Sequence, residues 1–151
     1  MELRGSRKVE DMTLEQRLRA FGVTEKTIKG DGNCQFRSIS DQLFGTPERY
    51  AEVRKMVITQ LVMKQEEYEV FVPDDYETYV RKMARDGEWG DHLTLKAASD
   101  VYGRRMCILS SYEKNFLIEI TPLEVKHPRV LWLSFWAEVH YNSIYPAGAH
   151  S

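Results

Sequence analysis

The spacing of apolar residues changes once along the chain, near residue 103, and this change constrains the fold more than any other feature. Before it, apolar residues recur at helical spacing, as Leu14, Leu18 and Phe21 do. After it, short apolar runs such as 106–109 alternate with polar loops, which is typical of strands. Helices that precede strands in this way favour an α+β class, with a small central sheet flanked by helices.

Local capping residues predict where the helices begin and end. Thr13 to Gln16 has the spacing of a capping box, and Gly45 and Gly103 stand where helices would stop. The expected helices cover residues 14–21, 34–44, 47–64, 74–85 and 91–102. The expected extended segments cover residues 26–29, 106–109, 116–120, 130–135 and 139–145. Residues 130–135 are apolar on both faces, which predicts a central strand covered on both sides.

Length and composition bound the class of protein. The 151 residues fit one domain, which we divide into a flexible leader (1–11), a globular domain (12–146) and a tail (147–151). A net charge of −2 does not mark a nucleic-acid binder, and no apolar stretch approaches the ~20 residues of a membrane span. Two cysteines form no disulfide framework in a chain of this length, which favours a reducing compartment. We therefore expect a soluble intracellular domain.

Cys34 occupies a position suited to nucleophilic chemistry. It follows residues 30–33 (GDGN), a turn-forming run that can direct its amides inward, and it opens a predicted helix. Unpaired N–H groups and the helix dipole would lower the pKa of Cys34 there and could bind an oxyanion. The alternative is a buried structural cysteine, as we expect for Cys107 within the apolar run 106–109.

A catalytic thiol needs a base, and His140 is the candidate among the four histidines. His127 and His150 lie in polar segments, and a capping role is expected at the helix start that holds His92. His140 follows the most apolar strand, and in an extended chain Asn142 would project to the same face. The carboxamide oxygen could accept the imidazole N–H and fix its tautomer. A satisfied core histidine is the alternative, because this spacing alone is weak evidence.

Three segments together resemble those of the ovarian-tumour (OTU) deubiquitinases. Residues 30–38 (GDGNCQFRS) resemble the family's cysteine box, D-G-x-C followed by an aromatic residue two positions on. Residues 140–144 (HYNSI) resemble its histidine box, and residues 89–98 (WGDHLTLKAA) resemble its W-G-x-x-x-E-L-x-A-L segment. The boxes occur in the family's order between about residues 27 and 145, and they look most like those of plant OTU proteins.

The resemblance implies a papain-like fold and a thiol protease, with no metal or cofactor. Such an enzyme hydrolyses isopeptide and peptide bonds at the C-terminal glycine of ubiquitin through an acyl-enzyme thioester. The resemblance makes Cys34 the nucleophile, His140 its base and Asn142 the residue that orients the base. Three residues are expected to shape the cysteine loop and its oxyanion hole, namely Asp31, Gly32 and Asn33.

The resemblance also implies partners. We expect a monomer that binds ubiquitin and polyubiquitin chains, not nucleic acid or membrane, in the cytoplasm, with the nucleus left open. Ubiquitin's basic tail ends in two glycines, so a narrow channel with acidic groups should receive it. The channel candidates are Trp136, Trp89, Glu88 and Asp91. Core packing or a solvated helix face is the alternative for each of them.

Two positions depart from the family pattern. Gln35 stands where many members carry an apolar residue, and Thr94 stands where the middle segment often carries Glu. Neither belongs to the triad, so these departures bear on substrate preference more than on activity. Two other functions stay open, namely a catalytically silent ubiquitin-binding module and a peptidase for another ubiquitin-like modifier.

Overall fold

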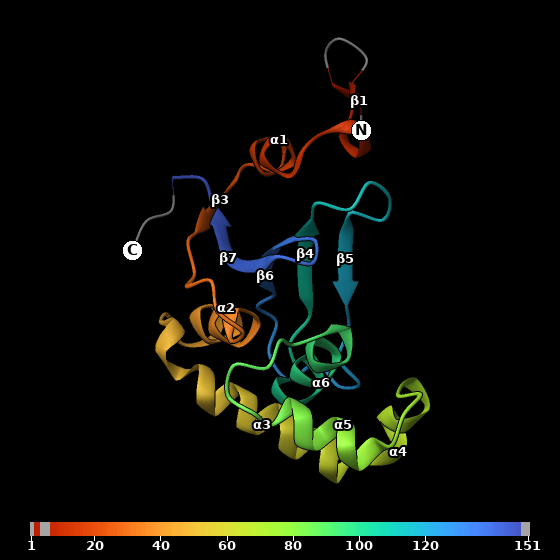
Figure 1. Cartoon of the computed structure of the whole chain (residues 1–151). Helices are drawn as coiled ribbons and strands as arrows, with labels where there is room; N and C mark the ends of the chain where they lie inside the picture. The colour runs from red at the N-terminus through yellow and green to blue at the C-terminus, as the bar shows by residue number, and fades with distance from the viewer. Residues whose placement is uncertain (1, 4–6, 149–151) are drawn as a thin grey trace.

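A five-stranded mixed sheet forms the centre of the computed structural model, which describes residues 2–3 and 7–148 (Figure 1). The strands are β3 (Val23–Lys26), β4 (Met106–Ser110), β5 (Leu117–Ile120), β6 (Leu131–Trp136) and β7 (His140–Pro146). Their order across the sheet is β3-β7-β6-β4-β5, with β4 and β6 parallel and the other neighbours antiparallel. The predicted central strand is confirmed, because β6 lies in the middle of this order.

Helices cover both faces of the sheet. The helices are α1 (Leu14–Ala20), α2 (Cys34–Phe44), α3 (Tyr50–Met63), α4 (Gln65–Tyr68), α5 (Tyr76–Met83) and α6 (His92–Tyr102). In Figure 1, α1 lies on one side of the sheet and the larger helices gather on the other. The capping box at Thr13 is confirmed, and Gly45 and Gly103 end α2 and α6 in the left-handed conformation, as predicted.

Two apolar clusters hold the helices to the sheet, one on each face. In β4, Ile108 belongs to the large cluster that contains Phe36 of α2, whereas the next residue, Leu109, packs with Leu14 of α1. Neighbouring residues of a strand point to opposite faces, so β4 serves both clusters. The same alternation in β6 directs Leu133 to the large cluster. The site described below lies where α2 meets this doubly covered sheet.

The structure corrects two of the predicted elements. The first strand covers Val23–Lys26, not residues 26–29, because its partner is the distant β7 and no local pattern records that pairing. The chain then leaves the sheet edge, and the Ile28 amide binds the Asn142 side chain. A short helix, α4, and the 3-10 turn η3 (Glu69–Phe71) follow α3 in a segment where none was predicted.

The two ends of the chain fall partly outside the described residues. Within the expected leader, β1 (Glu2–Leu3) pairs with β2 (Arg7–Lys8), and η1 (Val9–Asp11) follows. Away from the ends, the remaining 3-10 turn of the described residues, η2 (Pro47–Arg49), precedes α3. No helix among residues 2–3 and 7–148 is long and apolar enough to span a membrane. The predicted boundaries of leader and tail remain predictions.

Candidate active site

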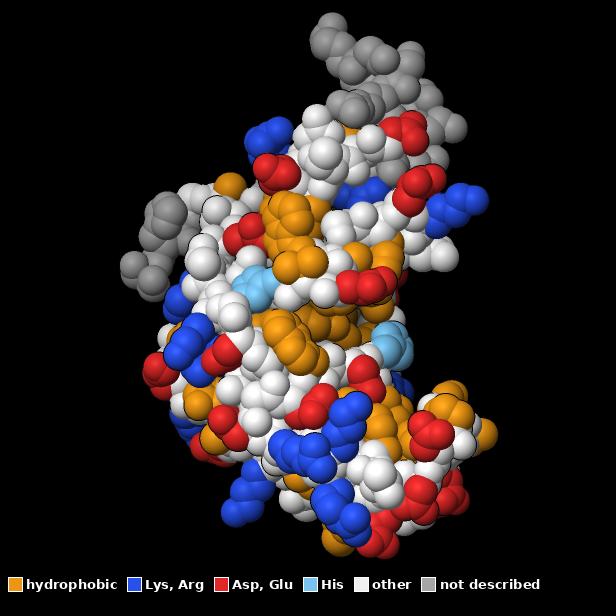
Figure 2. All heavy atoms as spheres, viewed as in Figure 1, with side chains coloured by type: hydrophobic (Ala, Val, Ile, Leu, Met, Phe, Trp, Pro, Cys, Tyr) orange, Lys and Arg blue, Asp and Glu red, His pale blue; other side chains and the backbone are white. Residues whose placement is uncertain are grey.

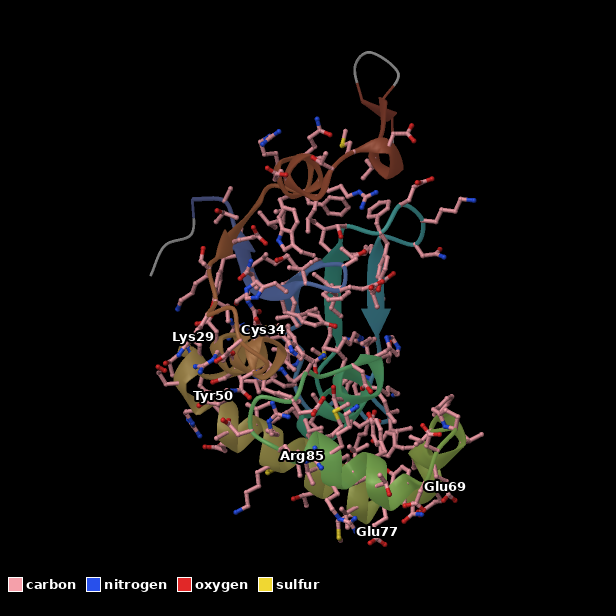
Figure 3. All side chains as sticks on the ribbon, in the orientation of Figure 1. Lys29, Cys34, Tyr50, Glu69, Glu77 and Arg85 are labelled. Carbon is pink, nitrogen blue, oxygen red and sulfur yellow. The ribbon has the colours of Figure 1, made fainter. Side chains whose placement is uncertain are left out.

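Cys34 is the first residue of α2, and its side chain is completely buried against the sheet. Figure 3 labels it where α2 meets the strands. Its sulfur accepts the N–H of Tyr141 at 3.5 Å, across 107 positions of sequence. The Cys34 amide donates to the Asp31 carbonyl at 3.1 Å, which closes a tight turn into the helix. The fold therefore places the cysteine beside the residue that follows His140.

The surroundings of the sulfur overturn the predicted direction of its pKa. Burial raises the pKa of the Cys34 thiol, and the Asp31 carboxylate raises it further, although the Tyr141 and Gln35 amides lower it. The helix start alone predicted a lowered pKa. That prediction was wrong because the sulfur lies beneath β7, where desolvation of a thiolate outweighs the amides. A nearby base must therefore remove the proton.

His140 opens β7, and its two ring nitrogens have different surroundings. Nε2 lies 2.7 Å from the Asn142 Oδ1 atom. This oxygen also accepts the Ile28 N–H at 2.8 Å, and a backbone N–H can only donate, so the carboxamide orientation is determined. Nε2 therefore carries the proton and Nδ1 is the basic nitrogen. Nδ1 faces the cysteine loop, since a Cβ atom on Gly30 would lie 3.9 Å from it.

Asn142 is held by contacts on both ends of its carboxamide. Its Nδ2 atom donates to Glu25 Oε2 at 3.0 Å, opposite to the oxygen that meets His140. The residue is 93% buried, with 7% of its surface exposed, so water competes little for these bonds. Sequence reasoning missed Glu25. Its only sequence signal is an acidic residue in a short extended segment, which is common at sheet edges.

Asp31 shapes the cysteine loop through an ion pair. Its carboxylate accepts the Asn33 amide at 3.0 Å and the Arg37 guanidinium at 3.0 Å. Burial disfavours the carboxylate, but the hydrogen bonds from Arg37 and Asn33 outweigh burial and lower the pKa of Asp31. Asp31 thus links the loop to the first turns of α2, and the shaping role predicted for it remains a prediction.

Gly32 and Asn33 attach the cysteine loop to the segment after α5. A Cβ atom on Gly32 would lie 1.5 Å from the Gly87 carbonyl oxygen, so no side chain fits there. The Asn33 Oδ1 atom accepts Arg54 Nη2 at 2.6 Å and the Gly87 amide at 2.9 Å. The Asn33 backbone amide donates to Asp31, so Asn33 is bonded both within the loop and to segments outside it. The oxyanion role predicted for these two residues remains a prediction.

Three of the four channel candidates lie in one segment beside the cysteine loop. Trp89 is half exposed. The backbone carbonyl of Glu88 accepts a hydrogen bond from Arg54 at 2.8 Å, and the Asp91 side chain caps the start of α6. The Asp91 carboxylate also accepts the Tyr79 hydroxyl at 2.8 Å. Figure 2 shows hydrophobic side chains across the middle of this face, between the sheet and the lower helices, with both acidic and basic side chains around them.

The fourth candidate, Trp136, lies on the histidine side of the site. It pairs with His140 across β6 and β7, and its indole N–H donates to Glu25 at 2.8 Å. Its ring packs against the smaller apolar cluster. The channel role of all four candidates remains a prediction.

Gln35 and Thr94, the two residues that depart from the family pattern, contact each other. Thr94 Oγ1 donates to Gln35 Oε1 at 2.7 Å, and Gln35 Nε2 donates to the Asp91 carbonyl at 3.1 Å. Both side chains are buried, and a Cβ atom on Gly90 would lie 2.4 Å from the Gln35 oxygen. Gln35 and Thr94 thus form one polar link between the starts of α2 and α6. Sequence reasoning noted the two positions separately and did not pair them.

The model of the OTU-like cysteine protease family matches residues 29–150. Over 135 residues the chain is 53% identical to ovarian tumor domain-containing deubiquitinating enzyme 9 of Arabidopsis thaliana, covering 89% of this chain and 39% of the relative. It is 47% identical over 137 residues to enzyme 12 of the same plant series, covering 91% and 63%. The chain thus spans less than two thirds of either relative.

Solved structures share the arrangement of helices and strands. The OTU domain of OTUD1 matches with a TM-score of 0.74 at 19% identity, covering 91% of this chain and 97% of that chain. An OTU domain in complex with ubiquitin matches with a TM-score of 0.68 at 15% identity, covering 81% and 69%. At such identities the likeness shows the fold, and it confirms the predicted α+β architecture. The plant relatives confirm the resemblance drawn from the three boxes.

Proposed function

The chain belongs to the OTU-like cysteine protease family, and we propose that it is a deubiquitinase acting through Cys34, His140 and Asn142. The observation that carries the proposal is the contact between the Cys34 sulfur and the Tyr141 amide, next to an imidazole oriented by Asn142. Ubiquitin is the proposed substrate. Two observations support it, namely that relatives are named deubiquitinating enzymes and that OTU domains of the same fold have been solved with ubiquitin bound.

The proposed reaction begins with proton transfer from the thiol. His140 Nδ1 takes the Cys34 proton while the sulfur attacks the carbonyl carbon of ubiquitin's terminal glycine. The tetrahedral intermediate collapses, the imidazolium protonates the departing lysine amine, and a thioester to Cys34 remains. His140 then removes a proton from water, which hydrolyses the thioester and releases the ubiquitin carboxylate with the thiol restored.

The raised pKa of Cys34 fits this order of events. Because burial favours the thiol, the sulfur carries its proton until the base removes it during attack. The neutral Nδ1 is available for this task because Asn142 holds the proton on Nε2. Asn142 contributes orientation without charge, so its removal should leave more activity than removal of His140.

An exposed apolar surface offers a place for the ubiquitin body. Val70 and Phe71 are 77% and 69% exposed beside a hollow of about 470 Å³ at the start of α6. Figure 3 labels Glu69 and Glu77 at this end of the molecule. Exposed apolar side chains with acidic neighbours suit a partner whose contact surface is apolar and basic. We propose that a monomer binds ubiquitin and polyubiquitin chains here, in the cytoplasm and also in the nucleus.

Cleavage of a panel of eight diubiquitin linkages tests the proposal. Wild type should release monoubiquitin from at least one linkage, and Cys34→Ala should release none while still binding ubiquitin. Cys107→Ala is the matched control, because it removes the other cysteine, and it should cleave like wild type. A folded wild-type protein that cleaves no linkage and leaves a C-terminal ubiquitin propargyl probe unreacted would reject the assignment.

A further inference from the structure

One carboxylate oxygen of Glu25 accepts hydrogen bonds from three side chains near His140, one of which is the Asn142 carboxamide. Glu25 Oε2 lies 3.0 Å from Asn142 Nδ2, 2.8 Å from Trp136 Nε1 and 2.6 Å from Ser134 Oγ. A carboxylate can only accept, so each of these groups must direct its hydrogen toward Glu25. The three donors come from two strands, β6 and β7, while Glu25 comes from a third, β3.

The register of the strands brings these residues to one face. Asn142 pairs with Ser134, His140 pairs with Trp136, and Glu25 pairs with Ile144 two positions beyond Asn142. Paired residues and residues two apart share a face of a sheet, so all of them project to the side covered by α1. Glu25 is therefore placed by pairing between strands that lie more than 100 positions apart in sequence.

We propose that Glu25 is a positioning residue for His140 and acts through Asn142, an inference that rests on the proposed function. The contacts run from His140 Nε2–H to Asn142 Oδ1, and from Asn142 Nδ2–H to Glu25 Oε2. A carboxamide could rotate to present either end to the imidazole. Because the Glu25 carboxylate can bind only the NH₂ group of the carboxamide, it keeps the Asn142 Oδ1 atom directed at His140.

Glu25 also supplies a charge that the triad itself lacks. Asn142 is neutral, so it stabilises an imidazolium less than a carboxylate would. A hydrogen bond to the Glu25 carboxylate polarises the carboxamide and strengthens its bond to Nε2–H. The other charged groups that act near the sulfur are Asp31, and Arg37 and Lys29 through Asp31. These three remain unchanged in every variant below, so differences between variants report on Glu25.

Steady-state hydrolysis of a fluorogenic ubiquitin C-terminal amide tests the inference in five proteins and one control. The five are wild type, Glu25→Ala, Glu25→Gln, Asn142→Ala and the Glu25→Ala/Asn142→Ala double variant. Glu25→Ala should lower kcat about tenfold with little change in KM, as expected for a residue that orients a base. The same change should have almost no further effect once Asn142 is absent. Glu119→Ala, on the opposite edge strand, is the matched control and should behave like wild type.

The pH profile separates positioning from general stability. Removing the negative charge disfavours the imidazolium relative to the neutral ring, so the acid limb of kcat/KM should move to lower pH in Glu25→Ala. Glu25→Gln keeps an oxygen acceptor without the charge. It should recover most of kcat but retain the shifted acid limb, and it serves as the folded variant if Glu25→Ala unfolds.

Two results would overturn the inference. One is a Glu25→Ala loss that is undiminished in the Asn142→Ala background, and the other is an unshifted acid limb in Glu25→Gln. An NMR titration of the His140 ring in the free protein measures the same coupling without turnover. If the ring of Glu25→Gln titrates at lower pH than the ring of wild type and wild type is inactive on ubiquitin, the proposed function is rejected and the positioning role stands. If the two rings titrate at the same pH and wild type is active, the positioning role is rejected and the proposed function stands.

Discussion

In the cysteine half of the site the turn before Cys34 is closed by neighbours in sequence, although Asn33 also binds Arg54 and Gly87. The histidine half is held by neighbours across the sheet. Asp31 binds Arg37 six positions away, within a single turn and helix. Asn142 binds Glu25 and Ile28, which are 117 and 114 positions away. A one-residue shift in strand pairing would move the histidine half to the other face, while the cysteine loop would keep its own bonds.

The histidine half of the site depends on the whole fold more than the cysteine half does. A short motif can specify the turn before Cys34, because the carboxylate, the amides and the guanidinium that form it are close in sequence. No short motif can specify the Glu25 contact, because it exists only after β3 has paired with β7. We therefore expect damage to the sheet to affect catalysis through His140 first.

The largest effect should come from removing the base. His140→Ala should lower kcat/KM by roughly 10³-fold or more, since Cys34 loses its proton acceptor, while ubiquitin binding persists. Hydrolysis of a fluorogenic ubiquitin amide measures this loss. His127→Ala, in an exposed loop, is the control and should retain wild-type rates. Near-normal turnover in His140→Ala would disprove the base assignment.

A substantial but smaller effect should follow from crowding the cysteine loop. Gly32→Ala places a methyl group against the Gly87 carbonyl, so the loop must move. We expect a loss of about 1–3 kcal/mol in unfolding free energy and a fall in activity of roughly tenfold or more. Gly45→Ala is the control, because it has open space at φ 75° and should cost about 1 kcal/mol without loss of activity. Equal activity in both variants would show that the loop tolerates displacement.

The link between Gln35 and Thr94 should give an intermediate effect on stability. Thr94→Val leaves the buried Gln35 oxygen without its donor, which should cost about 1–3 kcal/mol in a urea unfolding experiment. Gln35→Leu combined with Thr94→Val should cost less than the sum of the single changes, because the unpaired group is then gone. Additive losses would mean that the two side chains do not depend on each other.

The smallest effect is expected at the second cysteine. Cys107 is partly buried in β4, not fully buried as predicted, and β4 pairs with β5 and β6 rather than with β7, which carries His140. Burial raises the pKa of its thiol as it does for Cys34, so Cys107 differs from Cys34 by its place away from the strand of the base. Cys107→Ser should keep kcat/KM within about twofold of wild type, since β4 belongs to the scaffold and not to either half of the site. Loss of activity in a folded Cys107→Ser protein, checked by circular dichroism, would contradict that structural role.

Local chemistry explains what could be predicted. Thr13, Gly45 and Gly103 act on their own helix ends, so the sequence placed α1, α2 and α6 closely. The turn before Cys34 and the alternation at His140 and Asn142 are likewise visible over a few residues. These patterns identified the residues that the fold then brings together.

Long-range packing explains what could not be predicted. The direction of the Cys34 pKa depends on coverage by β7, which no feature of the cysteine box records. The bounds of β3 and the contacts of Glu25 depend on strand pairing across the whole chain. The bond between Gln35 and Thr94 likewise required the position of α6 against α2.

The place of β3 at the sheet edge has a practical consequence for choosing where to cut the chain. The family match begins at residue 29, but β3 ends at Lys26. A fragment trimmed to the match would expose the hydrogen-bonding edge of β7 and uncover Leu109 and Ile144, which α1 now shields. Such a bare edge recruits strands from other molecules. An expression fragment should therefore begin before Thr13. We expect a shorter fragment to aggregate even though its cysteine box is intact.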